Sequence, residues 1–238
     1  MRKTKAATCI FLFIGFMPFL LGACISKPAV DSSAIEHQTV HIDLQPPVVT
    51  EKKTEHPPFL GPGKQSIWQD VEAYTEWLYS CRTIFETETV HSDDTSGGAT
   101  VGLKVKGVTI KLSLPISVYL PAKARPELKE HEDGHVLICS LVYRNAYRAA
   151  REAGLLIVGK TYEGMGKNLD EARAVALSQP EKIIAAAYQE AVADVCGQAS
   201  EKYDEYCHRY TGDLKKSRSE LAKSAYKTIS DIPIKVIK

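Results

Sequence analysis

The feature that most constrains this chain is a long stretch of alternating apolar and polar residues near its middle. From Val108 to Leu120 every second residue is apolar, and polar residues or Pro115 lie between them. Because successive side chains of a β-strand point to opposite faces, the pattern predicts a strand with one buried face, and the proline indicates an edge or a bulge. A shorter alternating run, residues 101–105, precedes it across a Lys-Gly pair, which favours a hairpin.

After one helix at its start, the rest of the domain is predicted to contain strands first and helices afterwards. We expect a helix at 65–80, a strand at 83–90 and a turn at 91–98, and, after the alternating stretch, helices at 126–152, 169–179 and 181–209. Such an order is typical of an α+β domain.

The helix at 126–152 carries a motif with chemical meaning. Residues 131–135 read H-E-D-G-H, and the two histidines of an H-E-x-x-H pattern lie one helical turn apart, where they can bind one zinc ion together. Glu132 is then placed to accept a proton from a metal-bound water as a general base. His131 and His135 share a helix face with apolar residues, so they are expected to point toward the core. This inward placement favours a metal site over two structural histidines.

The N-terminus predicts export and a lipid anchor. Residues 1–23 have a basic start, an apolar run and the ending Leu-Gly-Ala, followed by Cys24. The run is too short for a stable membrane span and is typical of a signal peptide, and its ending resembles a bacterial lipobox, in which the cysteine is lipidated. We expect an anchor at Cys24 in the bacterial cell envelope, facing the periplasm, and Ile25 in place of an aspartate favours the outer membrane.

Composition divides the mature chain into a tether and a domain. Residues 24–58 are polar and contain two Pro-Pro pairs, so we expect a tether there and a folded domain at 59–238. The 30 Lys and Arg residues nearly balance the 29 Asp and Glu residues and give a net charge of +1, so nothing indicates a nucleic acid as a partner.

Four cysteines remain in the mature domain. They allow three pairings, among which the sequence does not choose: Cys81, Cys139, Cys196 and Cys207. The last two lie about 16 Å apart along one predicted helix and should not pair with each other. A link from Cys139 to either of them would join two helices.

A second motif is a coincidence. Residues 154–161 satisfy the phosphate-loop pattern G-x-x-x-x-G-K-T, but four bulky apolar residues fill its interior and a predicted helix precedes it. A phosphate loop follows a strand and needs small or polar residues, so its backbone amides can surround the phosphate.

Three segments together resemble a known family. VTIKLSLPISVYLP, PELKEHEDGHVLI and EKYDEYCHRYTG are similar to segments of a bacterial family of unknown function, described as predicted secreted zinc-dependent proteases of the zincin superfamily. The resemblance covers roughly residues 61–211. It implies a zincin-like α+β fold, with antiparallel strands packed on the H-E-x-x-H helix and on a second long C-terminal helix.

A catalytic zinc ion needs a third protein ligand, and two residues are candidates. The resemblance implies His208, because the family signature is Tyr-Asp…Thr-x-His-Gly. Here Tyr203-Asp204 match it, Cys207 replaces the threonine, and the histidine lies one place early. Glu190 is the alternative, since its surroundings resemble the glutamate helix of thermolysin-like proteases. The two candidates lie about 27 Å apart along an unbroken helix, so only one can reach the metal.

The resulting hypothesis is a lipid-anchored zinc metalloprotease of the cell envelope, with a peptide or protein as substrate. Zn²⁺ polarises the scissile carbonyl, Glu132 is the general base, and Tyr203 or Tyr206 donates a hydrogen bond to the developing oxyanion. The alternative is a non-catalytic envelope lipoprotein that uses a zincin-like fold as a binding or scaffolding module.

Overall fold

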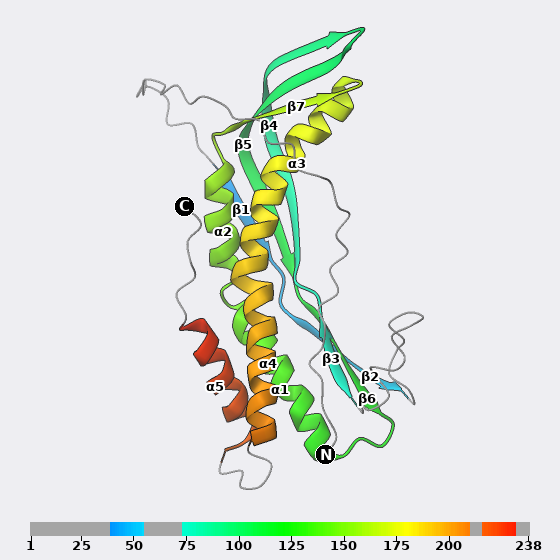
Figure 1. Cartoon of the computed structure of the whole chain (residues 1–238), viewed down its shortest axis with the longest axis vertical. Coiled ribbons are helices and arrows are strands. Elements are labelled where there is room, and N and C mark those ends of the chain that lie inside the picture. Colours follow the sequence, from blue (N-terminus) through cyan, green and yellow to red (C-terminus); the bar gives the residue numbers. More distant parts are fainter. Residues whose placement is uncertain (1–38, 55–72, 210–215, 232–238) are drawn as a thin grey trace.

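The computed structural model describes residues 39–54, 73–209 and 216–231, and these form an α+β fold, as expected (Figure 1). The signal peptide and Cys24 lie outside the described residues, as do residues 65–72 of the expected first helix. None of the helices in the described part of the chain is long and apolar enough to cross a membrane.

The larger sheet is built around β5 (Gly98–Ser113), which pairs with three other strands. These are β1 (Thr39–Leu44), in parallel, and β4 (Ser80–Thr95) and β7 (Thr161–Gly166), both antiparallel. β4 and β5 form one long hairpin whose turn is at residues 96–97, so the predicted turn at 91–98 begins too early.

The hairpin expected across residues 106–107 is wrong, because β5 continues through them. The pairing moves from Glu86–Gly107 to Thr87–Val105, which leaves Lys106 as the extra residue of a β-bulge. A bulge shifts the alternation by one residue. The buried apolar side chains are therefore odd-numbered up to Val105 and even-numbered from Val108.

The alternating stretch also passes from the larger sheet into a smaller one. β6 (Pro115–Pro121) follows β5 after Leu114 and lies between β2 (Val48–Thr54) and β3 (Tyr74–Trp77). Pro115 is the first residue of its strand, where a missing backbone N–H is tolerated.

Two expectations about the N-terminal half are wrong. Residues 39–54, expected as part of a tether, form β1 and β2, which run parallel to β5 and β6 with continuous backbone pairing. The folded part therefore begins by Thr39, not at residue 59. The end of the helix expected at 65–80 is instead β3, in which Thr75 and Trp77 are buried with the period of two of a strand.

Helices α1, α2 and α3 pack against the sheets, whereas α4 and α5 pack against α1 and against each other. The segments α3, η2 and α4 form one long rod (Figure 1). The bounds of the helices are α1 (Pro126–Tyr143), α2 (Ala146–Ile157), α3 (Leu169–Tyr188), the π-helical turn η2 (Gln189–Ala193), α4 (Asp194–Arg209) and α5 (Arg218–Ser230). The helices expected at 169–179 and 181–209 are thus continuous, and Pro180 is buried inside α3.

The single helix expected at 126–152 is divided at residues 144–145. The Asn145 side chain donates a hydrogen bond to Tyr226 Oη of α5 at 3.0 Å, which holds the turn, and α2 then packs against β1. Gly154 is required at that contact, since a Cβ there would lie 2.6 Å from Val40. The glycine-lysine-threonine pattern at 154–161 joins a helix to β7, which is the opposite order from a phosphate loop.

Candidate metal centre

Two helices bring together a compact cluster of three side chains of the kinds that can bind a metal ion. His131 and His135 extend from α1, and Asp204 extends from α4. The two Nε2 atoms are 3.3 Å apart, and each lies 3.2 Å from Asp204 Oδ1. The side chains are 13%, 7% and 11% exposed, respectively. This arrangement is a nearly equilateral triangle of donor atoms at the edge of the core.

The crossing of α1 and α4 explains why the cluster forms at this place. Gly134 lies against the ring of Tyr203, and a Cβ on it would lie 2.8 Å from Tyr203 Cε1 and closer still to Cζ and Oη. The ring of Tyr203 stacks on His131 with centroids 5.2 Å apart and meets His135 edge-on at 5.0 Å. The two helices therefore approach closely at the motif, and the next residue, Asp204, faces the histidines.

The charges of the cluster depend on one another. Burial opposes ionisation of Asp204, but the two histidines outweigh it and hold its pKa below the usual range. Burial also lowers the pKa of His131, whereas contacts with Asp204 and Cys207 and the nearby Glu132 raise it, to about 9 overall. A proton on His131 therefore balances the charge of the Asp204 carboxylate.

Two buried atoms of the cluster have no hydrogen bond from the described protein. They are His135 Nδ1 and Asp204 Oδ1. The contacts of Oδ1 with the two Nε2 atoms are close in distance only and lack hydrogen-bond geometry. A carboxylate oxygen that lies 3.2 Å from two imidazole nitrogens can share a proton with them, and the same three atoms could instead hold a metal ion.

Glu132 is placed separately, between α1 and the smaller sheet. Glu132 is 3% exposed, and its Oε2 accepts a hydrogen bond of 2.7 Å from Thr75 Oγ1 on β3. Burial raises the pKa of Glu132, while His135, His131 and the bond from Thr75 oppose this shift. A carboxylate with a raised pKa accepts protons more readily near neutral pH. Thr75 could not be singled out from the sequence, because a helix was expected there.

The two candidate tyrosines have different surroundings. Tyr203 is fully buried, and its hydroxyl donates to the backbone oxygen of His131 at 3.2 Å. Tyr206 Oη instead shares a hydrogen bond of 3.1 Å with Thr228 Oγ1 of α5. Only Tyr203 contacts the histidines of the motif, among the contacts described for these two residues.

The structure brings neither expected third ligand into the cluster. His208 lies one helical turn beyond Asp204 and is exposed, and Glu190 lies in η2, before α4 begins. The point where α4 crosses α1 is fixed by Tyr203, so the adjacent carboxylate takes the place that was expected for a later histidine. The Tyr-Asp pair of the family signature was the available signal.

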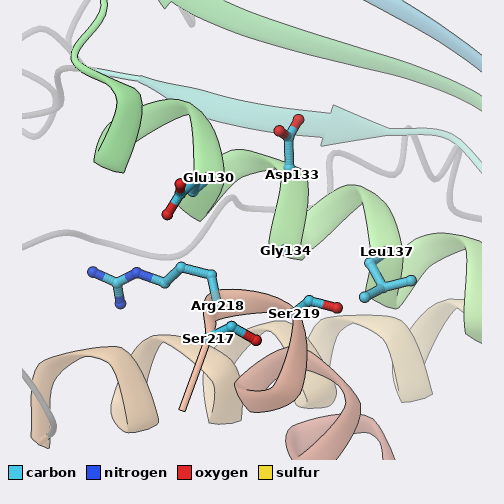
Figure 2. A pocket seen from close by; sticks show the side chains of 7 residues that line it. All are labelled: Glu130, Asp133, Gly134, Leu137, Ser217, Arg218 and Ser219. Carbon is cyan, nitrogen blue, oxygen red and sulfur yellow. The ribbon is translucent and has the colours of Figure 1, made fainter. Parts of the chain in front are cut away.

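A pocket lies beside the cluster, between α1 and α5. It has a volume of about 370 Å³, and Figure 2 shows its lining: Glu130, Asp133, Gly134, Leu137, Ser217, Arg218 and Ser219. It touches the H-E-x-x-H motif only through Asp133 and Gly134. None of the three clustered side chains lines it.

Comparisons with models of protein families, with curated proteins and with solved structures find no match to this chain. The likeness to zinc-dependent proteases therefore stays a prediction from the motifs. The cluster of two histidines and one aspartate is the feature from which a function can be reasoned.

Proposed function

We propose that this protein is a zinc-dependent hydrolase in which His131, His135 and Asp204 hold the metal. The single observation that carries the proposal is the triangle of donor atoms, with sides of 3.2–3.3 Å. Ligand atoms at about 2.1 Å from a tetrahedral zinc ion lie about 3.4 Å from one another. The donor set therefore fits zinc with little movement.

The chemistry of the donors narrows the choice of metal. Two imidazole nitrogens and one carboxylate oxygen suit zinc and neighbouring transition metals, whereas Ca²⁺ and Mg²⁺ prefer sets made of oxygen alone. Three protein ligands leave one of four positions open, which is the pattern of catalytic rather than structural zinc sites. This count favours catalysis over the alternative of a non-catalytic binding module.

The surrounding residues fit a hydrolytic role. A bound zinc ion would supply a Lewis acid that polarises a carbonyl group and makes water more acidic. Glu132 would accept the proton of the attacking water on its carboxylate and pass it to the leaving amine. Thr75 holds that carboxylate from β3, and Tyr203 fixes the backbone and ring of His131.

The proposed substrate and the proposed location of the protein are both inferred from motifs in the sequence. The similarity of the motifs to those of secreted zinc-dependent proteases makes a peptide bond the proposed target. The lipobox-like ending at Cys24 makes the periplasmic face of the envelope the proposed place. The zincin-like fold is part of the same proposal.

The metal is tested by zinc binding to purified protein variants. We expect the unaltered protein to bind about one zinc ion, and Asp204→Asn to weaken binding by more than about 100-fold. Glu190→Gln and His208→Asn are the matched controls, and both should bind zinc as the unaltered protein does. Unchanged binding by Asp204→Asn, or loss of binding by His208→Asn, would contradict the proposed ligand set.

Catalysis is tested separately with Glu132→Gln. This variant should keep its zinc and lose the hydrolysis of peptides, because the amide cannot accept the proton. Zinc-loaded unaltered protein that cleaves nothing in a broad peptide library would instead support the non-catalytic module.

A further inference from the structure

A pair of thiols lies between the same two helices as the metal centre. Cys139 Sγ on α1 and Cys196 Sγ on α4 are 3.5 Å apart, and both residues are completely buried. Cys139 follows His135 by one helical turn, and Cys196 precedes Asp204 by about two. The thiol pair therefore occupies the interface that sets the positions of all three proposed ligands.

The geometry is close to that of a disulfide. A disulfide needs its sulfurs about 2.05 Å apart, so the two sulfurs must approach by about 1.5 Å in total. Rotations of the two side chains can share this movement, while the close contact of Gly134 with Tyr203 keeps α1 and α4 together. Tyr79 Oη donates a 2.9 Å hydrogen bond to the backbone oxygen of Cys139, which helps to hold that residue in place.

We propose that Cys139 and Cys196 form a disulfide that joins α1 to α4 when the protein folds in an oxidising compartment. Each thiol loses its hydrogen, one bond forms between the two sulfurs, and two electrons and two protons pass to the disulfide of a thiol oxidant. That oxidant is thereby reduced to a dithiol. The signal-like N-terminus predicts export to a compartment where such oxidants act.

The bond forms before the interface closes. Burial raises the pKa of the Cys139 thiol well above its ordinary value, so the folded protein holds it protonated and out of reach of an oxidant. Thiol–disulfide exchange requires an accessible thiolate. Oxidation therefore belongs to folding after export, and the finished bond is protected from reductants by the same burial.

The remaining two described cysteines have other surroundings. Cys81 lies on β4 opposite Leu112, and Cys207 lies on α4 near His131 and Tyr203. Cys207 follows Cys196 by 11 residues on the same helix, which separates them by about 16 Å. They serve as internal controls for the selectivity of the bond.

The first test maps cysteines in the full chain produced in the bacterial periplasm. The protein is denatured, alkylated without reduction and digested, and its peptides are examined by mass spectrometry. We expect one cross-linked species that contains Cys139 and Cys196, two hydrogen atoms lighter than the separate peptides, with Cys81 and Cys207 alkylated. Alkylation of both Cys139 and Cys196, or a link from either to Cys207, would overturn the proposal.

The second test measures thermal unfolding with and without a reductant that reaches the unfolded chain. Reduction should lower the Tm of the periplasmic protein by about 10 °C, because the bond closes a long loop. Cys81→Ala should retain this sensitivity, whereas Cys139→Ala should lack it. Equal Tm values for oxidised and reduced protein would refute a structural bond, and no step depends on zinc, so the result is independent of the proposed hydrolase.

Discussion

Replacing Gly134 by alanine perturbs the contact between α1 and α4 at a single methyl group. The new carbon would lie 2.8 Å from Tyr203 Cε1, whereas carbon atoms in contact prefer about 3.5–4.0 Å. Tyr203 is fully buried and its ring touches both histidines, so it has no free space to occupy. The helices must therefore move apart by about 0.7 Å or more.

The expected change in the free energy of unfolding results from two opposing effects. Alanine favours a helix over glycine by about 1 kcal/mol, and overpacking a tight contact costs about 1–3 kcal/mol. Gly197 on α4 is the matched control, because a Cβ there meets nothing within 4 Å. The propensity gain is common to both variants, so Gly134→Ala should be less stable than Gly197→Ala by about 1–3 kcal/mol.

Urea unfolding of the metal-free variants measures this difference in stability. Competition with a zinc chelator measures the effect of each substitution on zinc affinity. Gly134→Ala should bind zinc more weakly, because the histidines and Asp204 lie on helices that have moved apart. Gly197→Ala should bind zinc normally and unfold at a higher urea concentration than the unaltered protein. If both variants were stabilised equally, the close contact of Gly134 with Tyr203 would be wrong, and with it the explanation for where the cluster forms.

Two further predictions concern protons. Thr75→Val should lower the hydrolysis rate and move the acidic limb of the pH–rate profile to higher pH, because the hydrogen bond from Thr75 lowers the pKa of Glu132. Thr75→Ser keeps the hydroxyl and should keep the original profile. An acidic limb that does not move in the valine variant would exclude this role of Thr75. In the presence of a chelator, the free energy of unfolding should fall as the pH rises from 6.5 to about 9. Protonated His131 stabilises the fold fully below pH 6.5, the ordinary pKa of histidine in the unfolded chain, and this contribution is lost as the pH rises through about 9, its pKa in the folded protein. The loss should be about 2.5 kcal/mol by urea unfolding, and a flat profile over this range would show that the ion pair of His131 with Asp204 is absent in solution.

Local patterns in the sequence predicted those elements in which the spacing of apolar and polar residues shows which face is buried. The alternation in residues 108–120 marked the buried faces of β5 and β6, and the spacing of His131 and His135 placed them on the inner face of α1. The change of sheets at Leu114 and the bulge at Lys106 leave almost no trace in composition, because both depend on backbone pairing.

The errors have the same origin. β2 is mostly polar and its side chains are exposed, so its composition resembles that of a tether, and its pairing with β6 shows it to be a strand. The break at Arg144 and Asn145 lacks glycine or proline and depends on a contact with α5. Asp204 could not be chosen over His208 from the sequence, since the choice depends on where α4 crosses α1.

The strand pairing of residues 39–54 would limit how far a lipid-anchored form of the protein could work from a membrane. If Cys24 carries the lipid that its sequence predicts, 15 residues separate it from Thr39, the first residue of β1. A chain of this length spans at most about 50 Å, whereas a tether that continued to residue 58 would reach more than twice as far. The proposed hydrolase would therefore be confined to a thin layer next to the bilayer, and it would meet substrates that are themselves held at, or brought to, that surface.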